Sequence, residues 1–222
     1  MTLLVAILTR DLTIAFRSGG GWFYALFFFA VFTALAAIAF GPSLSALAVA
    51  APAAIWLAAA LAIQFSAADL FDNDMQDGSL RAFAAEHDSL FSYWAAKATL
   101  LVATAAAPTI ATAPFFLTML GVNFDDGVAV SLILLIGAPA LIAIAVLTSA
   151  LSTGLRAGGL LATIIAAPFA APVLVFGVTA AKAYLATGLF ASPELLILGA
   201  LSLFMSAATP VFAIAALRIS LE

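Results

Sequence analysis

The chain has no cysteine and very little charge. Of its 222 residues, 8% are Asp, Glu, Lys or Arg, and one is histidine. The missing cysteines exclude disulfides, thiolate nucleophiles and cysteine-ligated metals. The net charge of −4 leaves no basic surface for nucleic acid. Soluble domains average roughly 25% charged residues, so this chain has too few polar groups to cover a globule in water.

Long apolar stretches take the place of the missing charge. Hydrophobic residues make up 66% of the chain, and a stretch of about 18 apolar residues is long enough to cross a bilayer as a helix. The sequence predicts an all-α integral membrane protein and a single transmembrane domain over residues 1–222. Residues 22–217 form a six-helix bundle, and residues 69–94 form its one long polar loop. The predicted spans are 22–40, 44–68, 95–121, 128–152, 158–181 and 194–217.

Residues 1–21 are too polar to span the membrane and predict an interfacial helix followed by a hinge. At about 100° per residue, Thr9, Arg10 and Arg17 share one arc of the helix. Asp11 is the exception, because it lies within the apolar arc. Such an amphipathic segment suits the membrane surface, and the alternative is a frayed N-terminus. Glycines then give a flexible break before the first span.

The placement of Lys and Arg predicts the orientation. With six spans, one side of the membrane receives Arg10, Arg17, Arg81, Lys97, Arg156 and Arg218, and the other receives Lys182. Cytoplasmic loops carry the excess of basic residues, so both termini are predicted to be cytoplasmic in a bacterial inner membrane. Lys97 and Lys182 lie near span ends and are expected to snorkel to the surface. Without ionisable groups at mid-depth, ion-coupled transport is disfavoured.

The loop between the second and third spans carries the richest signal. Asp77, Gly78 and Ser79 predict a turn that caps a short helix beginning near Leu80. Such a cytoplasmic helix is a natural docking element for a soluble motor subunit. The residues expected to couple this chain to a motor are Asp72, Asp74, Asp77, Gly78, Ser79, Leu80 and Arg81.

Metal binding by this loop is disfavoured. Counted from Asp69, the twelfth position of a calcium-binding loop would be Leu80, where a bidentate acid is needed. The lone His87 is read as a solvated loop residue. We therefore expect no bound metal or cofactor.

The chain also lacks the motifs of an enzyme. It contains no G-x-x-x-x-G-K-[ST] phosphate loop, no G-x-S-x-G and no H-E-x-x-H. Any energy from ATP must therefore come from a partner subunit.

Short motifs along nearly the whole chain resemble the haem exporter protein B family, also called cytochrome c maturation protein B. They include Arg10-Asp11-Leu12 with Arg17 in the interfacial segment, and Ile55-Trp56 in the second span. The most specific are Leu70-Phe71, Asp74 and Asp77-Gly78-Ser79-Leu80. Gly154-Leu155-Arg156 with Gly158-Gly159, Pro168 with Pro172, and Ala216-Leu217-Arg218-Ile219-Ser220 complete the series.

The resemblance implies the permease subunit of an ABC transporter that works with a separate ATPase, cytochrome c maturation protein A. It also implies a haem-handling membrane subunit, a small accessory subunit, and haem delivery through a chaperone to c-type cytochromes. Haem is then the cargo, and ATP binds the partner. The turn at Arg156, Gly158 and Gly159 belongs to the expected functional set. After Leu80 the sequence departs from the family, because Arg81 stands where an acidic residue is usual.

Two other interpretations stay open at this point. One is an ABC permease for another amphipathic or lipid-like cargo, which the apolar spans fit equally well. The other is a membrane scaffold that transports nothing. A homodimer is expected in either transporter, because an ABC transporter needs two permease halves.

Overall fold

The computed structural model describes residues 3–17, 21–86, 90–155 and 158–221. Within these ranges every regular element is helical, which confirms the predicted all-α fold. The elements are α1 (Leu3–Arg17), α2 (Gly21–Phe40), α3 (Leu44–Ser66), α4 (Asp72–Gln76), α5 (Ser79–Glu86), α6 (Leu90–Leu101), the π-helical η1 (Val102–Ala106), α7 (Ala107–Met119), α8 (Phe124–Ser152), α9 (Gly158–Thr187) and α10 (Pro193–Leu221).

Among the described residues, six segments are long and apolar enough to cross a membrane, as predicted; α6, η1 and α7 together form the third. Four predicted ends are wrong by four residues or more. The third span begins at Leu90 and not at residue 95, and α9 continues to Thr187, beyond the predicted end at residue 181. Helix α8 begins at Phe124 and not at residue 128, and α10 continues to Leu221, beyond the predicted end at residue 217. Polar residues stand near these ends, where hydropathy gives no signal for helix. The helical backbone satisfies its own hydrogen bonds there all the same.

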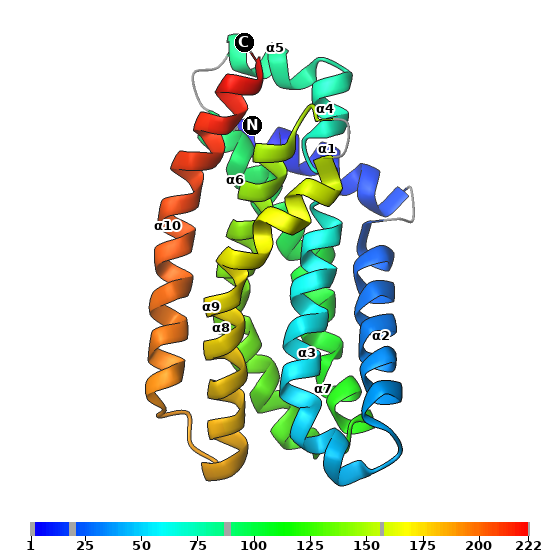
Figure 1. Ribbon diagram of the computed structural model, residues 1–222. Helices are drawn as coiled ribbons and strands as arrows, with labels where there is room; N and C mark the ends of the chain where they lie inside the picture. The colour runs from blue at the N-terminus through cyan, green and yellow to red at the C-terminus, as the bar shows by residue number, and fades with distance from the viewer. Residues whose placement is uncertain (1–2, 18–20, 87–89, 156–157, 222) are drawn as a thin grey trace.

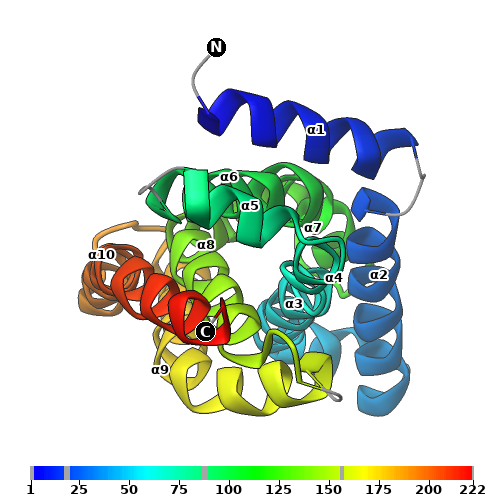
Figure 2. The same cartoon turned by 90° about the horizontal axis from the view of Figure 1, so that it is seen from above.

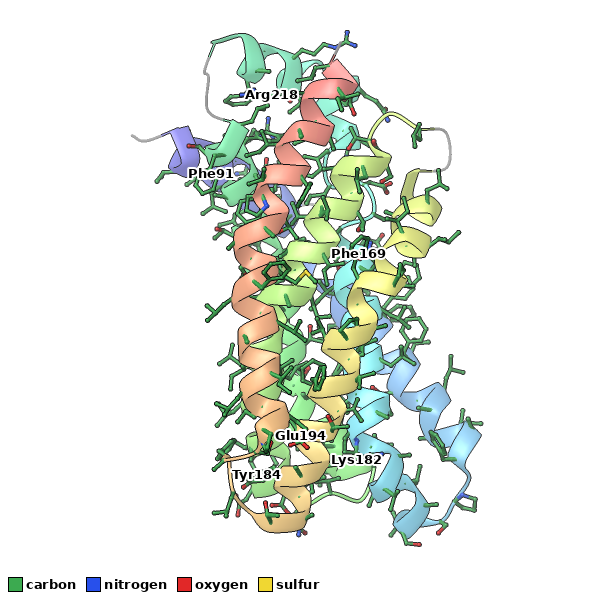
Figure 3. The ribbon with its side chains drawn as sticks, turned by 60° about the vertical axis from the view of Figure 1, so that its left-hand side comes forward. Phe91, Phe169, Lys182, Tyr184, Glu194 and Arg218 are labelled. Atoms are coloured by element: carbon green, nitrogen blue, oxygen red, sulfur yellow. The ribbon has the colours of Figure 1, made fainter. Side chains whose placement is uncertain are left out.

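Figure 1 shows the long helices running side by side, with α1, α4 and α5 gathered at one end. We call this the charged end, and the opposite end, with the turns after α2, α7 and α9, the turn end. The chain's C-terminus also lies at the charged end (Figures 1 and 2). Arg218 lies at the charged end, and Lys182 and Glu194 both lie toward the turn end (Figure 3). Seen from above, α1 lies across the outside of the bundle along α6 (Figure 2).

Helix α8 is the core of the bundle. Of its most apolar stretch 78% is buried inside the protein, against 17% for α2 and 22% for α10. It packs against α10, α9, α7 and α3. The outer helices present large apolar side chains such as Leu35, Ile164 and Leu203. Because lipid tails are themselves apolar, these exposed apolar faces are suited to contact with lipid.

The third span changes its winding where α6 meets α7. Through η1, the backbone N–H of Ala107 donates to the carbonyl of Val102, five residues back. Pro108 follows immediately and has no N–H to donate. A single π turn of this kind bends a helix and re-aims the side chains on either side of it. It separates the half of the span near the charged end from the half near the turn end.

One indole ring fixes how closely the central helices approach. Trp56 of α3 is completely buried. A Cβ atom added to Gly137 of α8, or to Gly177 of α9, would lie 2.5 Å from Trp56 Cη2. The ring therefore occupies space that only glycine leaves free. Close approach at small residues is the usual way in which membrane helices pack.

This packing predicts that Gly177→Ala destabilises the bundle. The added methyl group overlaps a rigid ring, and overpacking typically costs about 1–3 kcal/mol. The matched control is Gly199→Ala in α10, where the nearest atom would be Ile136 Cγ2 at 3.9 Å. Thermal unfolding of the two purified variants in detergent gives the comparison. Equal melting temperatures would contradict the close packing of Trp56.

Candidate functional site

The polar loop between α3 and α6 is an ordered structure of two short helices. Helix α4 ends at Gln76, and the backbone N–H of Ser79 donates to Oδ1 of the following Asp77 at 2.8 Å. Gly78 has a φ of +76°, which few residues other than glycine adopt. Helix α5 then begins at Ser79, so the predicted short helix is confirmed. The hydrogen bonds from Ser79 hold the pKa of Asp77 below its ordinary value.

Aromatic packing attaches the loop to the third span. Phe71 and Leu80 are completely buried. The ring of Tyr93, on α6, lies 5.8 Å from the ring of Phe71 and 5.8 Å from that of Phe83, measured between centroids. Phe71, just before α4, and Phe83, in α5, therefore both pack against Tyr93 of the third span. Arg81, by contrast, is exposed on the outer face of α5.

Four charged side chains meet beneath this loop, and they come from three helices. Lys97 Nζ of α6 lies 2.8 Å from Asp11 Oδ2 of α1 and 2.6 Å from Asp74 Oδ2 of α4. Arg10 Nη2 of α1 lies 2.8 Å from Asp11 Oδ1 and 2.8 Å from Asp74 Oδ1. Each carboxylate thus contacts both cations. We call these four residues the ion network.

Hydroxyl groups complete the coordination of Asp74. The hydroxyl of Tyr93 donates to Asp74 Oδ2. The hydroxyl of Ser79 donates to Asp74 Oδ1 at 3.3 Å. Lys97 Nζ also lies 5.4 Å from the centroid of the Tyr93 ring, within the range of a cation–π contact. Asp74 is thus the point at which α1, α4, α5 and α6 are joined.

The network is largely removed from solvent. The exposed fractions are 7% for Asp11, 5% for Asp74 and 5% for Lys97, whereas the side chain of Arg10 is 36% exposed. Burial opposes ionisation of Asp74, but Lys97, the hydroxyl of Tyr93 and Arg10 outweigh it and hold the pKa of Asp74 below its ordinary value. Burial alone would lower the pKa of Arg10. The hydrogen bonds and negative charges of Asp11 and Asp74 outweigh burial, so the pKa of Arg10 is raised above its ordinary value.

A cavity of about 620 Å³ opens beside the network. It is lined by residues of α1, α2, α3, α4 and α6, among them Arg10, Asp69 and Asp77. All four members of the ion network line this cavity. Arg10, whose side chain is 36% exposed, is the member most open to water.

A second contact joins the loop to the turn that follows α8. The backbone N–H of Gly154 donates to Asp72 Oδ1 at 3.0 Å. Gly158 and Gly159, singled out in the sequence, open helix α9 just beyond. Arg156 lies outside the described residues. Asp72 therefore joins the predicted coupling loop, which comprises α4, α5 and the turn between them, to Gly154, two residues before the position of Arg156 in the sequence.

One sequence interpretation needs correction. Lys97 was expected to snorkel toward the surface, but it points into the protein and pairs with two carboxylates. Asp11 was expected as a residue of the interfacial helix, and its exceptional place on the apolar arc of α1 is explained by its pairing with Lys97. Each residue was visible as a charge in apolar surroundings, but nothing in the sequence identified its partner. Arg17 lies exposed at the end of α1, as an interfacial residue should.

The described acidic side chains of the loop are either exposed or bonded within the protein. Across the part of the chain that the structure describes, no group of three or more His, Asp or Glu side chains is placed to hold a metal ion. Asp69 is exposed, Asp72 bonds to the turn at Gly154, and Asp74 is taken up by the ion network. His87 lies outside the described residues.

Comparison with known proteins shows what kind of chain carries this arrangement. The family described as "CcmB protein" matches residues 2–220. The chain belongs to the CcmB family. It is 36% identical to Heme exporter protein B of Bradyrhizobium diazoefficiens over the whole of both chains. It is 33% identical to that of Rhodobacter capsulatus over 98% of this chain and 99% of the relative. For Escherichia coli K12 the identity is 32%, over 97% and 98%. The CcmB match thus covers the bundle, α1 and the coupling loop together.

The geometry predicts that Lys97→Met destabilises the protein strongly. Removing one member of a buried charge pair typically costs about 3–5 kcal/mol, because the partner charge stays buried without compensation. Here two carboxylates would be left with Arg10 alone. The measurement is thermal unfolding of the purified chain in detergent.

Lys182→Met is the matched control, because Lys182 is an exposed lysine on a membrane helix at the turn end. It is expected to unfold like the unmodified chain. If Lys97→Met and Lys182→Met unfolded at the same temperature, the ion network would not contribute to the fold.

Proposed function

We propose that this chain is the membrane permease subunit of an ATP-driven ABC transporter complex that serves haem export, or release of a haem chaperone, in c-type cytochrome biogenesis. The observation that carries the proposal is the match to the CcmB family over residues 2–220. The relatives bear the name Heme exporter protein B. Residues 1–222 act as a single permease domain.

The charged end supplies a docking surface for a motor. Helices α4 and α5 lie at the end of the bundle (Figure 1), with Arg81 exposed on α5. Their inner side is fixed by Phe71, Leu80 and the ion network. A motor subunit pressing on the outer side would therefore act on a braced element and not on a loose loop. The partner is an ABC ATPase of the cytochrome c maturation protein A type.

The distribution of basic residues supports a cytoplasmic charged end. Among the described basic residues, Arg10, Arg17, Arg81, Lys97 and Arg218 belong to α1, α5, the start of the third span and the end of α10, and Lys182 lies at the turn end. Because basic residues concentrate on the cytoplasmic side, both termini face the cytoplasm of a bacterial inner membrane. The motor and its ATP are on that side.

The remaining partners follow from the family. They are a second copy of this chain, a haem-handling membrane subunit and a small accessory subunit. The exposed apolar faces of α2, α9 and α10 offer the area that such subunits and lipid require. In this arrangement the partner hydrolyses ATP, and this chain transmits the resulting movement to its helices in the membrane.

One observation favours a second cargo, an amphipathic or lipid-like molecule. An apolar cavity of about 260 Å³ lies between α6, η1, α7, α8 and α10, with Pro139, Trp94 and Ser206 in its walls. It suits an apolar tail as well as part of a porphyrin. A deletion strain that still made c-type cytochromes at the normal level would favour this alternative.

The coupling role predicts that Gly78→Val lowers the yield of c-type cytochromes several-fold. A β-branched residue is strained at the positive φ of Gly78 by about 1–2 kcal/mol, so the turn between α4 and α5 must change. Haem-stained cytochromes in membranes, the amount of this chain and the amount of co-purified ATPase are measured together.

Gly188→Val is the matched control. Gly188 also has a positive φ, of 71°, and like Gly78 it has open space around its Cβ position, but it lies at the turn end. It is expected to retain cytochrome yield. Equal effects of the two variants on cytochrome yield would contradict the coupling role. A reporter fused after Asp77 gives an independent test, and a periplasmic location of that reporter would also contradict the coupling role.

A further inference from the structure

Helix α1 is attached to the coupling loop through charge. Its buried side consists of Ile7 and Asp11, one turn apart, and it packs along α6. Arg10 and Asp11 reach from this helix to Asp74 on α4 and Lys97 on α6. The bond from Arg10 to Asp74 joins positions 64 residues apart in the sequence.

The rest of α1 is placed for the membrane surface. Val5, Ile14 and Phe16 are exposed, with Ile14 at 58% and Phe16 at 56%. Thr9 and Thr13 are also exposed. At about 100° per residue, Val5 and Phe16 share the exposed side of α1 with Thr9 and Thr13, opposite Ile7 and Asp11. Amphipathic helices of this kind lie in the boundary between headgroups and acyl chains, and we expect this side of α1 to lie there while the side with Ile7 and Asp11 contacts the bundle.

We propose that the ion network makes α1 a working part of the coupling device, with Arg10 and Asp11 as positioning residues that oblige α1 to move with α4, α5 and the start of the third span. This inference rests on the proposed function, because it takes α4 and α5 to be the motor's docking element.

The physical reason is that separating the members of the ion network costs a large free energy. Asp11, Asp74 and Lys97 are each at least nine-tenths buried. Separating α1 from α4 by a few ångströms would leave buried charges without their partners, and the uncompensated charge is what makes such a break costly. A displacement of α4 is therefore passed to α1 and to α6 at the same time. A displacement of α6 then reaches η1, the bend within the third span.

The geometry also allows α1 to be disconnected selectively. The double variant R10Q/D11N removes one positive and one negative charge, both from α1. The pair between Asp74 and Lys97 remains, with the hydroxyl of Tyr93 still donating to Asp74. The remaining site is neutral, so the loop stays attached to α6 while α1 loses its charged link.

The experiment uses the full complex. In cells it measures c-type cytochrome yield, and in the purified complex the rate of ATP hydrolysis. The quantity that tests the proposal is the ratio of the first to the second, at matched amounts of this chain in the membrane. We expect R10Q/D11N to lower this ratio about tenfold, which lies in the usual range for coupling between two sites. The conservative variant R10K/D11E keeps both charges and is expected to restore most of the ratio.

Arg17→Gln is the matched control, because it neutralises an exposed cation on the same helix. It is expected to leave the ratio unchanged. The proposal is overturned if R10Q/D11N keeps the ratio of the unmodified chain. It is also overturned if yield and hydrolysis fall in parallel, since the network would then only stabilise the complex. Failure of the proposed function itself would show without any variant, as an unmodified chain that binds no ATPase.

Discussion

The charged end of this protein depends on two carboxylates and two cations paired with one another. Asp11 and Asp74 each contact both Arg10 and Lys97, at distances of 2.6–2.8 Å. Burying one such charge alone would be prohibitive. Burying Asp11, Asp74 and Lys97 is tolerable because opposite charges are paired, the partly exposed Arg10 completes the set, and the Tyr93 hydroxyl donates to Asp74. The arrangement leaves little freedom for the segments that carry them. It fixes where α1 lies and how the coupling loop meets the third span.

The remainder of the bundle is built on a different principle. Around α8 the helices are held mainly by small residues and by shape, as at Trp56, where glycines of two neighbouring helices make room for the ring. Two buried hydrogen bonds between helices add to this packing, from Gln64 to the hydroxyl of Thr148 and from the backbone N–H of Ala140 to the hydroxyl of Ser202. Apolar packing of this kind transmits force but carries little directional information. The ion network, in contrast, joins particular atoms on particular helices. The ion pairs between the described residues thus lie at the end of the molecule where a motor would act.

Local patterns explain why much of the fold was predictable. Hydropathy alone predicts the six spans. The three-residue sequence Asp77-Gly78-Ser79 predicts the turn before α5. The network was not predictable, because it joins Arg10 to a residue 64 positions away and Lys97 to two different segments. Its members did leave a signal: Asp11 on an apolar arc and Lys97 inside a span. Sequence showed that each was out of place but not that they belonged together.

The central claim is that α1 and the coupling loop form one mechanical unit, and a distance measurement tests it most directly. Because the chain has no cysteine, spin labels can be attached at Thr13 of α1 and Ala82 of α5, both exposed and outside the network. The labelled chain is diluted with unlabelled copies in the full complex, with and without trapped ATP. The account predicts the same Thr13–Ala82 distance in both states, while the distance from each label to one at Leu189 changes. A Thr13–Ala82 distance that shifts with ATP would contradict it.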